Sequence, residues 1–255
     1  MVALASEPQS IGKVLDSGFR LFVKAFTSAL PLSLAAAAVL AVPNIANVLM
    51  GGTEQAPGPV PASTVLVLFL VALPIYMILI AAVVYRLGAA AELHEASTTG
   101  QALARGVRCV LSLIGAAILY FLAMAAGLIL LVIPGIILSL SLSFGFFAIV
   151  LDGESALAAL KRSHRLVWGN WWRTLAVVSV PVVIVMILYL GLGIVFGATL
   201  VMSDGKPSSD VLITANLIEA AIGGITAPLI YSIMIAQYHD LKLRKEGHDL
   251  AARLA

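Results

Sequence analysis

Cysteine and charge are the two features that this sequence lacks. Cys109 is the single cysteine among 255 residues, so no disulfide forms within the chain and small disulfide-stapled scaffolds are excluded. Charged residues make up 11% of the chain, against about 25% in soluble domains. A net charge of +2 provides no strongly basic surface, so we expect no nucleic-acid partner.

Apolar residues take the place of the missing charges and make up 61% of the chain, which also excludes a disordered protein. A hydrocarbon core of about 30 Å requires about 20 apolar residues in a helix. Residues 1–255 are therefore predicted to form a single all-α transmembrane domain with six transmembrane helices. Runs of sufficient length lie at 26–50, 64–85, 107–133, 136–151, 174–201 and 211–238.

The third and fourth of these runs lie in one uncharged stretch of 43 residues between Arg108 and Asp152. A single helix of that length would measure about 64 Å, which is too long for one crossing. Pro134-Gly135 lies near the centre of the stretch, and this pair suits the tip of a tight helical hairpin. We therefore predict two crossings joined at Pro134-Gly135.

The basic residues indicate the orientation of these helices. Fourteen of the fifteen Lys and Arg residues fall on one face of the predicted topology. The connections on the opposite face, at 51–63, 134–135 and 202–210, contain Lys206 alone. The positive-inside rule then places both termini in the cytoplasm. The tryptophans beside the basic loop, Trp168, Trp171 and Trp172, are predicted to form an interfacial anchor.

A short signature precedes three of the predicted spans, and it places a leucine, a small residue and an arginine at fixed spacing. An amphipathic helix with this layout lies along the membrane surface. We therefore predict interfacial helices near 10–24, 98–107 and 153–168, and three repeats of an interfacial helix plus a helical hairpin. Chance similarity among amphipathic helices is the alternative. The three copies are Leu15-x-x-Gly18-x-Arg20, Leu103-x-x-Gly106-x-Arg108 and Leu160-x-x-Ser163-x-Arg165.

Several segments resemble the YciC-like bacterial membrane proteins, which are related to the membrane domain of some glycerophosphoryl diester phosphodiesterases. This resemblance implies a multi-pass protein of the bacterial plasma membrane without an established biochemistry. These 255 residues include no segment that resembles the phosphodiesterase catalytic domain, so we expect no phosphodiesterase activity from them. The segments are Ile133-Pro134-Gly135-Ile136-Ile137, Phe147-Ala148-Ile149-Val150-Leu151-Asp152-Gly153 and Gly169-Asn170-Trp171-Trp172, with Ile11-Gly12 and Gly18-Phe19 near the N-terminus.

Motifs for catalysis are weak. Asp152-Gly153-x-x-Ala156 resembles the opening of the CDP-alcohol phosphotransferase signature, but the next acid after Glu154 is Asp204, and a hard cation needs several oxygen ligands. The alternative is that Asp152 or Ser155 caps the following helix. The sequence contains no nucleophile elbow, Walker loop or zinc motif. We expect no enzyme activity, no cofactor and no metal site.

Glu219 is the only acid well inside a predicted span. An intramembrane carboxylate is energetically costly, so by default it indicates a functional site. Asn216 lies one turn earlier on the same helical face, and Asn44 and Asn47 lie at a similar depth on the first span. These four residues are predicted to form one polar site in the outer half of the bilayer. The alternative is a tilted sixth span that brings Glu219 close to the headgroups.

The basic face leads to the first functional expectation, a non-enzymatic protein that organises, remodels or protects the bacterial envelope. A transporter or lipid-handling protein with its site around Glu219 is the alternative. Membrane lipids with anionic headgroups are the expected partners, and the small-xxx-small spacing of Gly193 and Gly197 suits packing within a monomer or a homo-oligomer. The predicted lipid contacts are Arg20, Arg108, Lys161, Arg162, Arg165 and Arg173.

Overall fold

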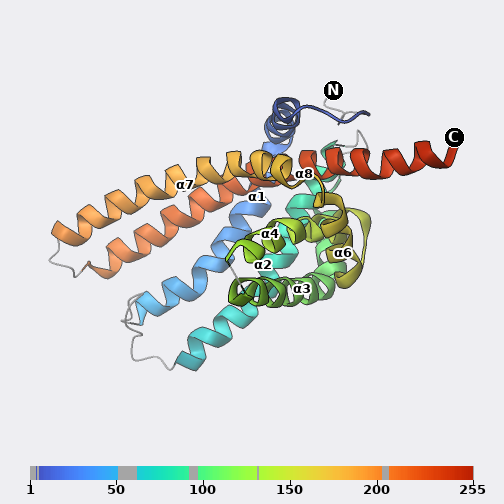
Figure 1. The fold of residues 1–255 in the computed structure, drawn as a ribbon. Helices are drawn as coiled ribbons and strands as arrows, with labels where there is room; N and C mark the ends of the chain where they lie inside the picture. Colours follow the sequence, from blue (N-terminus) through green and yellow to red (C-terminus); the bar gives the residue numbers. More distant parts are fainter. Residues whose placement is uncertain are drawn as a thin grey trace.

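The computed structural model describes residues 4, 6–50, 62–91, 97–130, 132–202 and 207–254, with side chains at 62, 130, 132 and 247–254 left aside. All regular elements in these ranges are helical (Figure 1). They are α1 (Ile11–Leu49), α2 (Ala62–Ala91), α3 (Thr99–Leu130), α4 (Val132–Leu142), α5 (Gly145–Phe147), the π-helical segment η1 (Ala148–Asp152), α6 (Ala156–Val167), α7 (Trp171–Met202) and α8 (Ser209–Leu254).

Six segments of the described chain are long and apolar enough to cross a membrane, as predicted. Five of them are the single helices α1, α2, α3, α7 and α8, and the sixth combines α4, α5 and η1. The helix α8 continues well past the predicted boundary at 238. This extension carries Asp240 and Arg244, which form an ion pair described below.

The predicted interfacial helices differ from the observed ones. Residues 10–24 and 98–107 are not separate helices, because α1 and α3 run through them without a break. Only the third segment is a separate helix, α6, which ends before Gly169 with its φ of 86°. Its apolar face is covered by protein, since Leu160, Ser163 and Leu166 are buried. This face of α6 therefore packs against the bundle, and an interfacial position of the helix stays a prediction.

In each copy of the signature, the small residue is buried and the arginine is exposed. An ideal Cβ on Gly18 would lie 2.7 Å from the Ile233 Cα, and one on Gly106 would lie 2.3 Å from the Ile78 carbonyl oxygen. Ser163 instead forms two hydrogen bonds with the backbone of the fourth predicted span, at Ser141 and Phe144. The signature thus marks close helix contacts, while the threefold repeat stays a prediction.

The fourth predicted span is broken at Ser143 and Phe144. Backbone groups inside a bilayer must find partners within the protein, and Ser163 supplies them at this break. Its hydroxyl donates to the Ser141 carbonyl oxygen at 2.6 Å and accepts from the Phe144 N–H at 3.0 Å. Farther along the chain, Arg105 donates to the Val150 carbonyl oxygen at 2.8 Å. Side chains of α6 and α3 therefore stabilise the irregular backbone.

The α3–α4 hairpin is present, but its tip lies next to the tryptophans at 168–172, from which the predicted topology separates it. An ideal Cβ on Gly127 would lie 2.9 Å from the Gly135 Cα, so the two helices meet closely beside Pro134. Three isoleucines at this tip share an apolar cavity of about 570 Å³ with the tryptophans at 168–172. The prediction puts the tip and the tryptophans on opposite faces. They lie together because the fourth span is broken and α6 runs back along α4.

Helix α1 packs mainly against α8 and α2 and lies between these two helices (Figure 1). Two glycines allow the α1–α8 approach, since Gly18 of α1 faces Ile233 and Gly224 of α8 faces Leu34. A side chain at Gly18 would collide with the Ile233 backbone, and one at Gly224 would collide with the Leu34 side chain. The two helices run antiparallel, so Asn44 near the end of α1 lies opposite Asn216 near the start of α8.

The substitution Gly18→Ala tests this close contact. We expect it to lower the free energy of unfolding by about 1–3 kcal/mol, because the added methyl group overpacks a backbone contact. Thermal unfolding of the protein in nonionic detergent measures the change. The matched control is Gly12→Ala on the same helix, where the methyl group meets nothing within 4 Å. Equal effects of the two substitutions would contradict the contact.

Candidate functional site

A cavity of about 350 Å³ lies among α1, α2, α7 and α8. Its α1 wall consists of positions 33, 37, 40, 41 and 44, and its α8 wall consists of positions 216, 219, 220, 223 and 227. Both sets recur every three or four residues, so each forms one face of its helix. Small side chains face each other across the gap, namely Ala37, Ala41, Ala220, Gly223 and Ala227. The cavity exists because neither helix fills this space.

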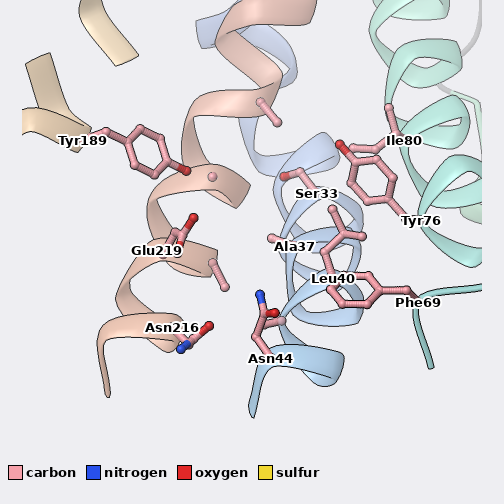
Figure 2. Close-up of a pocket in the computed structure, with 14 residues that line it drawn as sticks. Ser33, Ala37, Leu40, Asn44, Phe69, Tyr76, Ile80, Tyr189, Asn216 and Glu219 are labelled. Atoms are coloured by element: carbon pink, nitrogen blue, oxygen red, sulfur yellow. The ribbon is translucent and has the colours of Figure 1, made fainter. Parts of the chain in front are cut away.

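The polar side chains of the cavity come from all four helices (Figure 2). Three of the four residues predicted from the sequence line it, namely Asn44, Asn216 and Glu219. Asn47 does not line it. Glu219 is exposed at the wall, and no ion pair to it occurs among the described residues. The carboxylate is therefore accessible to a ligand.

Tyr76 and Tyr189 also line the cavity, and neither residue was predicted from the sequence. Tyr189 comes from α7, and its hydroxyl oxygen would lie 3.4 Å from an ideal Cβ on Gly223. The glycine thus leaves room for the phenol beside Glu219 (Figure 2). Both tyrosines lie in the interior of predicted spans. A buried phenolic hydroxyl usually needs a polar partner, and that requirement was a usable signal.

Two side chains of the cavity wall, Asn216 and Ser33, each donate a hydrogen bond to a backbone carbonyl oxygen of their own helix. The Asn216 Nδ2 donates to the Leu212 carbonyl oxygen at 2.9 Å, and the Ser33 hydroxyl donates to the Leu30 carbonyl oxygen at 3.0 Å. Each of these side chains still has an oxygen that can accept a hydrogen bond. The oxygen atoms of Asn216 and Ser33 are therefore available to accept hydrogen bonds at the wall.

The opposite end of the bundle contains a network of ion pairs around Asp152 and Arg162. The Asp152 carboxylate accepts from the Tyr238 hydroxyl at 2.7 Å and pairs with Lys242 at 3.1 Å and Arg162 at 2.9 Å. Arg162 also pairs with Glu154 at 2.7 Å and, through the same guanidinium, with Glu246 at 2.6 Å. This network joins α6 to α8.

Charge is retained at Arg162 despite its burial. Burial lowers the pKa of the guanidinium, but the hydrogen bonds to Glu154 and Glu246 and the charge of Asp152 raise it above its ordinary value overall. Asp152 serves in these pairs and not as a helix cap. Ser155 occupies the N-cap position of α6 without forming a capping hydrogen bond. No group of three metal-ligating side chains occurs in the described part of the chain.

Asp240 organises a second buried cluster, and its side chain is 3% exposed. It accepts from the Gln9 N–H at 2.7 Å and pairs with Arg173 at 3.0 Å and Arg244 at 2.8 Å. Arg244 also donates to the Gln9 carbonyl oxygen at 2.6 Å. The N-terminal segment, α7 and α8 are thus tied together at one carboxylate.

The predicted lipid contacts divide into two groups. Arg162 and Arg173 are engaged with the carboxylates described above and do not face the open surface. Arg108, Lys161 and Arg165 are exposed, while Arg20 is exposed and pairs with Asp16. Among the predicted anchor residues, Trp168 and Trp172 are 61% and 77% exposed, and Trp171 packs partly against the core.

These features define a helical protein built to cross a membrane several times, with a polar cavity among four of its helices. The chain belongs to a family described as a domain of unknown function (DUF7847), whose model matches residues 19–241. No curated protein and no solved structure matches the chain. The resemblance to YciC-like proteins stays a prediction.

The substitution Asp240→Asn tests the buried cluster. We expect it to lower the free energy of unfolding by about 3–5 kcal/mol, because it leaves two partly buried guanidinium groups without their counter-charge. The control is Asp16→Asn, which removes an exposed pair and changes the stability by less than about 1 kcal/mol. Chemical unfolding in detergent measures both. Similar losses for the two variants would contradict the importance of the buried cluster.

Proposed function

We propose that this protein binds a small ligand in the cavity at Glu219 and acts as a transporter or lipid-handling protein of the bacterial plasma membrane. The observation that carries the proposal is the convergence of Asn44, Asn216 and Glu219 on one cavity. Asn44 lies far from the other two residues in the sequence, and the three side chains come from two different helices. Together with Tyr76 and Tyr189, they form a polar surface inside an otherwise apolar bundle.

The position of the cavity supports ligand binding from the bilayer or from its outer surface. Glu219 lies about 15 Å along α8 from Ser209, and Asn44 lies about 8 Å along α1 from Leu49, at a rise of 1.5 Å per residue. A carboxylate at such a depth is costly to keep. The volume of the cavity, about 350 Å³, falls within the range of small-molecule sites.

The lining residues favour binding over catalysis. They include one carboxylate, and they include no histidine, cysteine or second acid. General acid–base and nucleophilic reactions usually require such a pair of groups within hydrogen-bonding reach. We therefore propose that the protein is not an enzyme.

Both termini are proposed to be cytoplasmic, with Asp152 and Asp240 on the cytoplasmic side.

Contact with anionic lipids is a second candidate role and would serve envelope organisation. It is favoured by the groove that the apolar cavity beside the α3–α4 tip forms, which Trp168, Trp172 and Ile136 line. The ammonium of Lys245 lies 3.5 Å from an ideal Cβ on Gly169, which also lines the groove. A cation beside an apolar groove suits a phospholipid with a negative headgroup. The two roles concern opposite parts of the molecule and are compatible.

Filling the cavity tests the proposed function. Ala220→Phe places a ring into the gap between α1 and α8, and Gly193→Leu adds a side chain where nothing lies within 4 Å. Each protein is purified in nonionic detergent, and the retained small molecules are quantified by mass spectrometry. We expect the native chain and Gly193→Leu to retain one compound in equal amounts, and Ala220→Phe to lose at least about nine-tenths of it, because the ring occupies the space that the ligand needs.

Thermal unfolding provides the control that all three proteins are folded. Equal retention by Ala220→Phe would contradict binding in the cavity. Absence of any retained compound from the native chain would contradict it as well.

A further inference from the structure

The charge of the cavity wall restricts the ligand that it can accept. Glu219 is the only charged residue among the lining residues, and none of them is a lysine, arginine or histidine. An anionic group placed there would meet a carboxylate in a medium of low dielectric constant, where like charges repel strongly. A cationic group would instead neutralise a charge that has no counter-ion among the described residues. The wall therefore selects for positive charge.

The aromatic rings of the cavity wall also favour a positively charged ligand. Phe69, Tyr76 and Tyr189 line the cavity on the sides that face Glu219 or lie next to it (Figure 2). The face of an aromatic ring carries partial negative charge and attracts a cation held within about 6 Å of its centroid. Quaternary ammonium groups are bound by such rings because they are large and weakly hydrated.

The hydrogen-bond acceptors of the cavity wall also favour a cationic ligand. One N–H of Asn216 and the hydroxyl of Ser33 donate to carbonyl oxygens of their own helices, and the oxygen atoms of both side chains can still accept a hydrogen bond. A small metal ion is a poorer match than an organic cation, since Ca²⁺ takes six to eight oxygen ligands and Mg²⁺ requires an octahedral set. Glu219 neutralises only half the charge of such an ion, and the other oxygen atoms of the lining belong to uncharged amide and hydroxyl groups.

Building on the ligand-binding function proposed above, we infer that the cavity recognises an ammonium group, with Glu219 as its counter-ion and Tyr76 and Tyr189 as its aromatic walls. The ammonium can be the headgroup of a lipid or part of a free, water-soluble cation. The recognition chemistry is the same in both cases, because only the charged group occupies the polar part of the cavity.

Titration calorimetry on the full chain in a maltoside detergent tests this inference and separates the two sources. Choline represents the free cation, and its uncharged carbon isostere 3,3-dimethylbutanol is the control. Decyltrimethylammonium represents the lipid-like cation, and decyl maltoside is the uncharged amphiphile. We expect at least one of the two ammonium compounds to bind saturably, about tenfold or more tightly than its neutral counterpart. Binding of decyltrimethylammonium alone identifies a lipid headgroup, and equal binding of choline identifies a free cation.

Two matched variants of α8 locate the binding. Glu219→Gln keeps the shape of the side chain and removes its charge, so we expect about tenfold weaker binding of the ammonium compound. Asp210→Asn changes an exposed acid in the first turn of the same helix, outside the cavity, and is expected to leave the affinity unchanged. Thermal unfolding verifies that both variants are folded.

Three results would overturn the inference. They are equal affinity for the charged and neutral members of each pair, undiminished binding to Glu219→Gln, and no binding of either ammonium compound. In each case the proposed ligand-binding function is judged separately, by the compound that the native chain retains and the Ala220→Phe variant loses. If that difference persists, the cavity binds a ligand of another class.

Discussion

The antiparallel contact between α1 and α8 determines the rest of the arrangement. Gly18 and Gly224 bring the two helices together at two levels, because a Cβ atom at either position would collide with the partner. Farther along, small residues face small residues and no side chain fills the gap. The same register that closes the contact at Gly18 therefore opens the cavity at Asn44 and Asn216.

The two ends of the bundle are stabilised differently. At one end, Asp240 ties the N-terminal segment and α7 to α8, and Asp152 joins α6 to α8 through Arg162, Tyr238 and Lys242. At the other end, the α7–α8 pair diverges from the α1–α2 pair (Figure 1). The cavity lies on the diverging side, beyond the close α1–α8 contacts at Gly18 and Gly224. A ligand that occupies it would add a further connection between the two helical pairs at the end where they separate.

Much of this architecture follows from the sequence, because span length, charge bias and depth depend on simple spacing. The six apolar segments were predictable, and so was the proximity of Asn44, Asn216 and Glu219, which line one cavity. The break at Ser143 was not predictable, since it depends on Ser163 from a different helix. The partners of Arg162 and Arg173 were hidden for the same reason. A count of basic residues does not show which of them face carboxylates within the fold.

The central claim is that an open cavity reaches Glu219 among α1, α2, α7 and α8. An experimental structure of the full chain in lipid nanodiscs, determined with a bound trimethylammonium compound, tests it most directly. The account predicts density for the compound between Glu219, Tyr76 and Tyr189. A bundle in which side chains close the space between α1 and α8, or in which the compound lies elsewhere, would contradict it.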